Sequence, residues 1–141
     1  MAILEITPLI GCSNVCEYCP QTTLIKQYKE KCSNDKEMSL EQFKKYISTI
    51  PTDVDMHFTG YVEPLLATDA PYMIEHAYLK GHDVLLNTTL MGLTPELWDR
   101  FLYNVIFKAI HIHLPSGSYE EMIGVKKPTE YYTHEGKEYK I

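Results

Sequence analysis

Short apolar runs and amphipathic segments alternate along most of the chain. Four of the apolar runs are typical of strands, because they are rich in aliphatic and β-branched residues or alternate between apolar and polar positions. These predicted strands span residues 3–10, 53–59, 83–86 and 107–113. The segments between them carry apolar residues at helical spacing, so the pattern predicts strands and helices in alternation.

Capping residues mark where the helices are predicted to begin. Residues 39–42, with the sequence SLEQ, form a capping-box pattern, and the helix that they open ends at Pro51. A second helix is predicted over 71–80, and a third opens with Thr94 as N-cap, whereas the polar segment 21–37 predicts a long loop or an irregular helix. The apolar side chains predicted to face the core are Leu40, Phe43, Ile47 and Ile50 in the first helix, Met73, Ile74, Ala77 and Tyr78 in the second, and Leu97, Trp98, Phe101 and Leu102 in the third.

This alternation predicts a parallel α/β sheet with right-handed crossovers. Polar or glycine-containing motifs follow the predicted strands directly, at residues 11–20, 60–64, 87–89 and 113–117. In parallel α/β folds, sites are built at the carboxyl ends of the strands, so we expect these motifs to lie together. Residues 117–141 are charged, with few aliphatic side chains, and predict a surface arm without a further strand or helix.

Composition restricts the class of protein. The chain has 141 residues, of which 45% are hydrophobic, so it can form one globular domain without a disulfide or a metal. The excess of 19 acidic over 13 basic residues argues against a nonspecific nucleic-acid surface, which needs basic side chains to neutralise phosphates. No apolar stretch approaches the roughly 18 residues of a membrane span, and no signal-peptide pattern opens the chain, so a cytoplasmic location is expected.

All cysteines lie in the first quarter of the chain. Cys12, Cys16 and Cys19 form a C-x3-C-x2-C run, and Cys32 follows separately. Grouped cysteines in a reducing compartment are more often metal or cluster ligands than disulfide partners. Gly11 and Pro20 bracket the run, which favours a loop over a helix with its thiols on one face.

Two kinds of metal centre fit this spacing. A structural zinc site would use all four cysteines as a closed tetrahedral shell, although zinc sites usually present two matched pairs of ligands. A [4Fe-4S] cluster held by three thiolates would leave one iron with an open coordination position, where chemistry can occur. Cys32 is then either a free, partly exposed thiol or an additional ligand.

The motifs together resemble those of the radical S-adenosylmethionine (radical SAM) enzymes. The cysteine loop follows the first strand, with Tyr18 just before Cys19, as in that family. Residues 58–66, FTGYVEPLL, are similar to its Gly-Glu-Pro segment, with Val62 where Gly is usual, and residues 87–89, NTT, are similar to its Thr-Asn-Gly. The resemblance covers residues 3 to about 116.

This resemblance implies an incomplete parallel (β/α) barrel. The family fold is a partial (β/α)6 barrel, and this chain contains about four βα units, with a core over residues 1–116 and the charged arm over 117–141. The strands that complete the barrel also contribute to substrate contacts in the family. The sequence therefore does not identify a substrate.

The resemblance also implies cofactors and their ligands. Cys12, Cys16 and Cys19 are expected to hold a [4Fe-4S] cluster, whose open iron binds the amino and carboxylate groups of S-adenosylmethionine. An external electron donor then allows its reductive cleavage to a 5'-deoxyadenosyl radical, which abstracts hydrogen from the substrate. The expected cofactor contacts are Tyr18 at the adenine, Gly60, Tyr61 and Glu63 at the methionine ammonium, and Asn87; no catalytic residue is assigned.

Two alternatives to a self-sufficient enzyme remain at this point. The chain is either a non-catalytic binding module stabilised by a metal on all four cysteines, or an inactive shortened derivative that needs a partner chain or a second copy to cover its open sheet edge. His111 and His113 lie two residues apart on the fourth predicted strand and so face the same side. Each is read either as lining the site or as a structural histidine.

Overall fold

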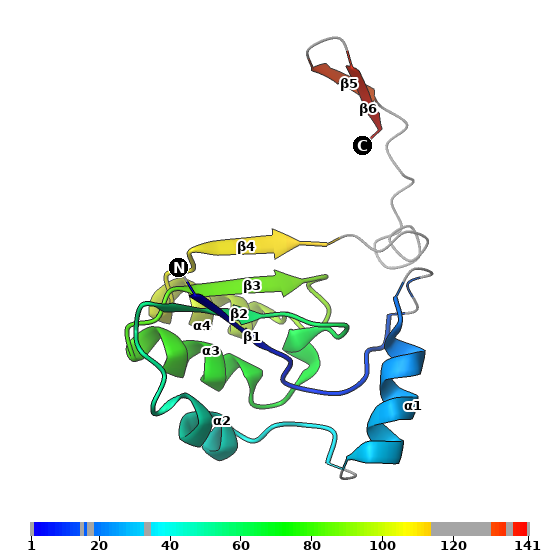
Figure 1. Cartoon of the computed structure of the whole chain (residues 1–141). Coiled ribbons are helices and arrows are strands. Elements are labelled where there is room, and N and C mark those ends of the chain that lie inside the picture. The colour runs from blue at the N-terminus through cyan, green and yellow to red at the C-terminus, as the bar shows by residue number, and fades with distance from the viewer. Residues whose placement is uncertain are drawn as a thin grey trace.

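The computed structural model describes residues 2–14, 16, 19–32 and 35–113, and the backbone of residues 131–134 and 137–140 (Figure 1). Strands and helices alternate along the chain as predicted. In order, the elements are β1 (Ala2–Ile6), α1 (Gln21–Lys31), α2 (Leu40–Ile47), β2 (Val54–Phe58), the short 3-10 helix η1 (Pro64–Leu66), α3 (Ala70–Leu79), β3 (Val84–Thr88), α4 (Pro95–Asn104), β4 (Ala109–Ile112), β5 (Tyr131–His134) and β6 (Lys137–Lys140).

The four strands of the main sheet are parallel and lie in the order β1-β2-β3-β4. Their register pairs Ile6 with Phe58 on β1 and β2, and Thr88 with Ile112 on β3 and β4. Each strand therefore lies beside the next one along the chain, as expected for repeated βα units. The predicted α/β class is confirmed, and the described sheet is not closed into a barrel.

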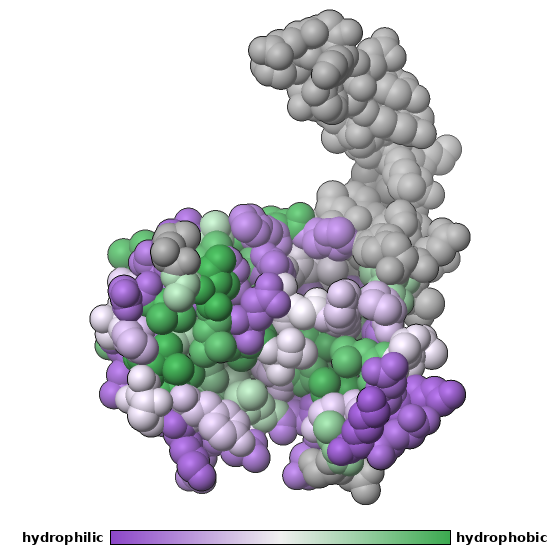
Figure 2. Space-filling view, in the orientation of Figure 1, coloured by the Kyte–Doolittle hydropathy of each residue, from purple (hydrophilic) through white to green (hydrophobic). Residues whose placement is uncertain are grey.

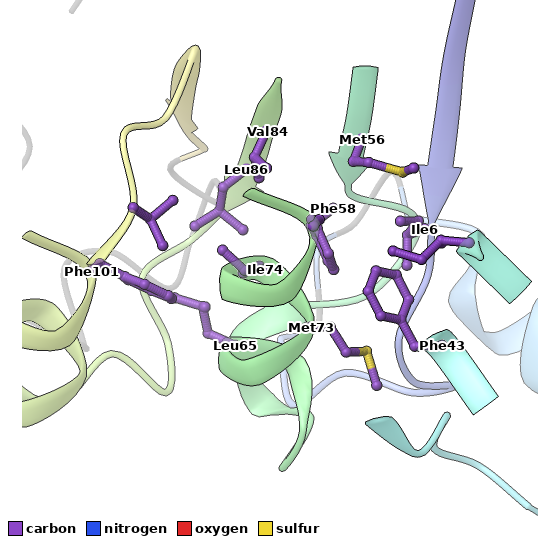
Figure 3. Close-up of a cluster of buried hydrophobic side chains, with 13 residues drawn as sticks. Ile6, Phe43, Met56, Phe58, Leu65, Met73, Ile74, Val84, Leu86 and Phe101 are labelled. Atoms are coloured by element: carbon purple, nitrogen blue, oxygen red, sulfur yellow. The ribbon is translucent and has the colours of Figure 1, made fainter. Parts of the chain in front are cut away.

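One face of the sheet is covered by α2, α3 and α4, and the hydrophobic core lies between these helices and the strands (Figure 3). Phe58 of β2 and Phe43 of α2 are in contact there, with ring centroids 5.8 Å apart. Alternate residues of each strand face this core, and the residues between them face the opposite side. The polar side chains of Glu5, His57 and Asn87 lie on that opposite face.

The predicted caps of α2 and α4 are confirmed. Ser39 Oγ accepts a hydrogen bond from Gln42 N at 3.2 Å, and Gln42 Oε1 accepts one from Ser39 N at 2.9 Å, which completes the capping box of α2. Thr94 Oγ1 accepts a hydrogen bond from Leu97 N at 3.2 Å at the start of α4. These bonds satisfy backbone donors that have no partner within the helix.

A charged cluster lies at the amino ends of strands β2, β3 and β4. Lys108 Nζ lies 2.9 Å from Asp55 Oδ2 and 2.9 Å from Asp83 Oδ2. Hydrogen bonds to Asp55 and then to Asp83 raise the pKa of the Lys108 ammonium above its usual value. Asp55 is buried, so this pair satisfies a carboxylate that would otherwise lack a partner.

Two details of α1 and α4 differ from the sequence-based expectations. In α4, Phe101 is buried, but Trp98 is 43% and Leu102 is 59% exposed, so the prediction that both face the core was wrong. Among the described helices that pack on this face of the sheet, α4 comes last in sequence. It contacts α3, and Phe101 is the residue that it buries. Segment 21–37, predicted as a loop or irregular helix, contains the regular helix α1, which has no buried residue and a hydrophilic surface (Figure 2).

A further difference lies in the predicted C-terminal arm. Residues 131–134 and 137–140 form an antiparallel pair of strands, where the sequence predicted neither strand nor helix. These two four-residue strands, YYTH and KEYK, are short and do not alternate between apolar and polar positions, so no strand pattern distinguishes them from loop sequence. No helix in the part of the chain that the structure describes is long and apolar enough to cross a membrane.

Candidate functional site

A cavity of about 390 Å³ lies at the carboxyl ends of the parallel strands. Segments far apart in the sequence meet there, because the loops after β1, β2 and β3 and the end of β4 all open at the same edge of the sheet. The lining residues are Cys12, Asn14, Cys16, Cys19, Pro20, Gln21, Thr59, Gly60, Tyr61, Val62, Glu63, Asn87, Thr88, Thr89, His111, Ile112 and His113.

The loop after β1 brings three thiols to one wall of this cavity. Cys12, Cys16 and Cys19 are partly buried and line it, and Cys19 N donates a hydrogen bond to Cys16 O at 3.0 Å. Cys32 is exposed at the end of α1 and does not line the cavity. The geometry therefore separates three cysteines from the fourth.

The thiols of this wall can be compared with the donors that a single metal ion and a cluster would need. Among the residues described, no three Cys, His, Asp or Glu side chains lie close enough together to hold one metal ion. A zinc site that used all four cysteines would place their sulfurs about 2.3 Å from one ion. A [4Fe-4S] cluster instead takes three separated thiolates on three of its irons, which is the donor set on this wall.

The loop after β2 requires a glycine at residue 60. The φ angle of Gly60 is +117°, and an added Cβ would lie 2.4 Å from Thr7 Oγ1. Both the backbone conformation and the close approach of Thr7 exclude a larger residue. Val62 is not among the described residues with positive φ, so its backbone does not demand the glycine that is usual there.

The carboxylate of Glu63 is held by four hydrogen bonds within the protein. Its Oε1 accepts from Thr88 Oγ1 at 2.7 Å and from Leu65 N at 3.1 Å. Its Oε2 accepts from Thr89 N at 2.5 Å and from Thr89 Oγ1 at 2.6 Å. The side chain is 1% exposed, so Glu63 joins the loop after β2 to the end of β3.

The cysteine loop is tied to the same point. Asn14 is 5% exposed, and its Nδ2 donates to Thr89 Oγ1 at 3.0 Å. Asn14 N also donates to Cys12 Sγ at 3.4 Å, and Gln21 Nε2 donates to Asn14 O. The three loops after β1, β2 and β3 are thus connected through side chains.

A second chain of hydrogen bonds crosses the cavity wall between β2, β3 and β4. Asn87 Nδ2 donates to Thr59 Oγ1 at 2.8 Å, and His111 Nδ1 lies 2.9 Å from Asn87 Oδ1. With the Asn87 amide in this orientation, His111 donates through Nδ1. Both His111 and His113 line the cavity, so the reading of these histidines as lining residues agrees with their position.

The structure brings together all of the predicted site residues that it describes. Seven of them line the one cavity: Cys12, Cys16, Cys19, Gly60, Tyr61, Glu63 and Asn87. Tyr18, the remaining predicted residue, lies outside the described residues. Sequence reasoning missed Asn14, Thr59 and Thr89 as hydrogen-bonding members of the site. The available signal was the position of Thr59 at the end of a predicted strand and of Thr89 in the motif 87–89 that follows the next one.

Comparisons with solved structures identify similar folds. The crystal structure of BtrN in complex with AdoMet and 2-DOIA matches with a TM-score of 0.64 and 20% sequence identity, over 88% of this chain and 50% of that chain. BtrN in an open conformation matches with a TM-score of 0.62 and 20% identity, over 85% of this chain and 53% of that one. The chain thus spans about half the length of BtrN.

Comparisons of the sequence agree with this fold. No curated protein matches the chain. The model of the radical SAM superfamily, in contrast, matches residues 6–140, which include the cysteine loop and strands β2, β3 and β4. A match over nearly the whole chain shows that the protein belongs to the radical SAM superfamily.

Proposed function

We propose that the chain holds a [4Fe-4S] cluster through Cys12, Cys16 and Cys19 and binds S-adenosylmethionine at the open iron of that cluster. The observation that carries this proposal is the meeting of the three thiols, loop 60–63 and Asn87 around one cavity. Membership of the radical SAM superfamily supports the same pair of cofactors. In BtrN, the structure was determined with AdoMet bound.

When bound, the reduced cluster supplies the electron that cleaves S-adenosylmethionine to methionine and a 5'-deoxyadenosyl radical, which abstracts hydrogen from the substrate. The residues of the chain provide ligands and orientation for this chemistry. Three thiolates, rather than four, leave one iron free to bind the amino and carboxylate groups of S-adenosylmethionine. The substrate is a further molecule that the chain's residues do not identify.

Residues of loop 60–63 are proposed to bind the methionine end of the cofactor. An ammonium group needs hydrogen-bond acceptors, which the backbone carbonyls of Gly60 and Tyr61 provide. The oxygens of Glu63 already accept four hydrogen bonds, so we propose that Glu63 acts on the ammonium through its negative charge rather than as a direct acceptor. Asn87 and Tyr18 complete the proposed contacts, with Tyr18 at the adenine.

Iron content of the purified chain tests this proposal. Anaerobic reconstitution should give about four iron atoms per chain, as for one [4Fe-4S] cluster. Cys12→Ala, Cys16→Ala and Cys19→Ala should each lose most of this iron, whereas Cys32→Ala, as the matched control, should retain it because Cys32 does not line the cavity. An iron-free, zinc-loaded chain that loses its metal in Cys32→Ala would instead support the module that uses all four cysteines.

A partner at the sheet edge is a second element of the proposal. Strand β4 is an edge of the described sheet, and large apolar side chains near it are exposed: Trp98, Leu102, Tyr103, Ile106 and Ile112. Exposed apolar patches mark interaction surfaces, so a second copy or a partner chain is proposed to cover this edge. The mass in solution, measured together with cofactor cleavage, separates an active monomer from a derivative that needs this partner.

The proposed reaction also needs an external electron donor, which reduces the cluster. We place the protein in the cytoplasm, where a reducing environment keeps Cys12, Cys16 and Cys19 free of disulfide bonds. Omission of the reductant from a reconstituted sample should therefore abolish cleavage of S-adenosylmethionine without lowering the iron content.

A further inference from the structure

We infer that Asn14 and Thr89 are positioning residues that clamp the cysteine loop onto the carboxyl end of β3 before any cluster binds. We call Asn14, Thr89 and Glu63 the loop clamp. The part of this inference that concerns the cluster rests on the proposed function, whereas the part that concerns the loop itself rests on the hydrogen bonds of the chain alone.

The clamp joins segments that are distant in sequence. Asn14 lies between the first two cysteines, and its amide donates to the Thr89 hydroxyl, 75 residues further along the chain, at 3.0 Å. Asn14 is 5% exposed, so water does not readily replace this bond. A buried polar side chain that loses its partner carries a full desolvation cost, which makes the bond costly to open.

Thr89 can hold Asn14 because Thr89 is itself held. Its hydroxyl has one proton, which it donates to Glu63 Oε2 at 2.6 Å, and its lone pairs then accept from Asn14. Its backbone N–H donates to the same Glu63 oxygen at 2.5 Å. Since Glu63 is also bonded to Thr88 and Leu65, the clamp is anchored on the rigid end of the sheet.

Asn14 transmits this anchoring to the thiols. Its backbone N–H donates to Cys12 Sγ at 3.4 Å, and its carbonyl accepts from Gln21 at the start of α1. The side chain, N–H and carbonyl of Asn14 are therefore all engaged, which fixes the backbone at Asn14. Hydrogen bonds to ligand sulfurs also influence the reduction potential of an iron–sulfur cluster.

The clamp preorganises the cysteine loop for metal binding. A free loop must lose conformational entropy when three of its thiols take fixed positions around a cluster. A loop already fixed by the clamp loses less, so the cluster is bound more tightly and released more slowly. The same clamp should limit the access of reagents to the thiols when no cluster is present.

The first experiment uses the full-length apo-protein and so does not depend on a cluster. Thiol alkylation by iodoacetamide is followed by mass spectrometry for each cysteine in the wild type, Asn14→Ala and Thr89→Val. We expect Cys12 and Cys16 to react about five-fold faster or more in both variants, as for loss of one buried hydrogen bond that limits local opening. The exposed Cys32 should react at an unchanged rate and serves as the internal reference.

Matched variants separate the clamp from general loss of stability. Thr94→Val removes a threonine hydroxyl that caps α4, outside the cavity, so it should lower stability without changing the reactivity of Cys12 or Cys16. Thr89→Ser keeps the hydroxyl and should restore wild-type rates. Equal alkylation rates in the wild type, Asn14→Ala and Thr89→Val would overturn the inference, as would an equal increase in Thr94→Val.

The second experiment measures iron release from the reconstituted chain to a ferrous chelator under anaerobic conditions. Asn14→Ala and Thr89→Val should release iron about five-fold faster or more than the wild type and Thr94→Val. Unchanged release with a full iron content would overturn the clamp's role at the cluster. A wild-type chain that takes up no iron would contradict the proposed function, and the alkylation result would still decide whether the clamp exists.

Discussion

Both carboxylate oxygens of Glu63 accept hydrogen bonds from within the protein, and these bonds hold two of the loops that line the cavity. Four donors from three residues surround its carboxylate, so Glu63 fixes the relative positions of the loops after β2 and β3. Buried polar networks of this kind are stable when every member is satisfied and costly when one member is removed. A residue of the Gly-Glu-Pro segment thus has a structural role besides the one proposed at the cofactor.

Gly60 gives a test at the residue scale. We expect Gly60→Ala to lower the free energy of unfolding by about 1–3 kcal/mol, because it forces a side chain into a positive-φ conformation and against Thr7. Gly11→Ala is the matched control: its φ is +123°, but an added Cβ meets nothing within 4 Å. Urea denaturation should show the larger loss for Gly60→Ala, and equal losses would contradict the role assigned to the Thr7 contact.

Sequence reasoning identified single residues where a spacing carried information. Cys12, Cys16 and Cys19 have a defined spacing and follow a strand, and all three line the cavity. Asn14 carries no comparable signal, because a lone Asn in a loop is common and its partner, Thr89, lies 75 residues away. The long-range pairing of polar side chains depends on loop conformations that the hydrophobic pattern does not encode.

At the scale of single elements, side-chain caps stabilise the starts of α2 and α4. Ser39 and Thr94 each accept a hydrogen bond from the first turn of their helix, and Ser39 gains a second, reciprocal bond through Gln42. We expect Ser39→Ala and Thr94→Ala each to lower the free energy of unfolding by about 1 kcal/mol. Thermal unfolding with Ser48→Ala as control, which alters a serine at the other end of α2, should show a smaller effect.

His76 of α3 predicts a dependence of stability on pH. Partial burial, with smaller contributions from the nearby Lys44 and Lys80 ammonium groups, lowers the pKa of the His76 imidazole below its ordinary 6.5. The folded state therefore binds this proton less readily than the unfolded state, so the stability contributed by neutral His76 is present above pH 6.5 and is lost as pH falls through the folded-state pKa.

The measurement that checks this is chemical denaturation at several pH values between about 7 and 5, the range in which a histidine with a lowered pKa titrates. The free energy of unfolding of the wild type should fall more steeply with decreasing pH than that of His76→Gln. Leu79→Ala, which alters an exposed residue of the same helix that does not titrate, should keep the wild-type slope. Identical slopes in wild type and His76→Gln would contradict the assignment.

Elements with a strong apolar period were predicted, and elements without one were not. Helix α2 combines a capping box with buried Phe43 and Ile47, and the sequence predicts its start correctly. Helix α1 buries no residue, so it leaves no apolar stripe for the pattern to reveal. For α4 the pattern revealed an apolar stripe but not how much of it a neighbour covers, which is why Trp98 and Leu102 are exposed.

At the scale of the whole molecule, four parallel strands in the described part of the chain carry the cavity at their carboxyl ends, and this sheet is not closed into a barrel. The parallel class and the gathering of motifs at one sheet edge follow from strand–helix alternation, and both were predicted. The chain covers about half of BtrN, so the activity and partners of a complete enzyme remain proposals for this protein. The hydrophobic pattern of the chain does not identify a partner for the edge strand β4, because that pattern describes packing within the chain.

The edge of β4 supports a prediction at this scale. Replacement of exposed Ile106 and Tyr103 by Lys should reduce self-association or partner binding, because both changes place charge on the apolar surface near β4. Light scattering should then show a lower mass than for the wild type. Leu79→Lys, an exposed apolar residue at the end of α3, is the matched control. A monomeric wild type whose mass no variant changes would contradict a second copy at this edge.

The most direct test of the account is the cleavage of S-adenosylmethionine by the anaerobically reconstituted and reduced chain. The account predicts 5'-deoxyadenosine and methionine in equal amounts from the wild type and from Cys32→Ala, and neither product from Cys16→Ala. A wild-type chain with a full iron content that forms no 5'-deoxyadenosine, alone or with a covering partner, would contradict it.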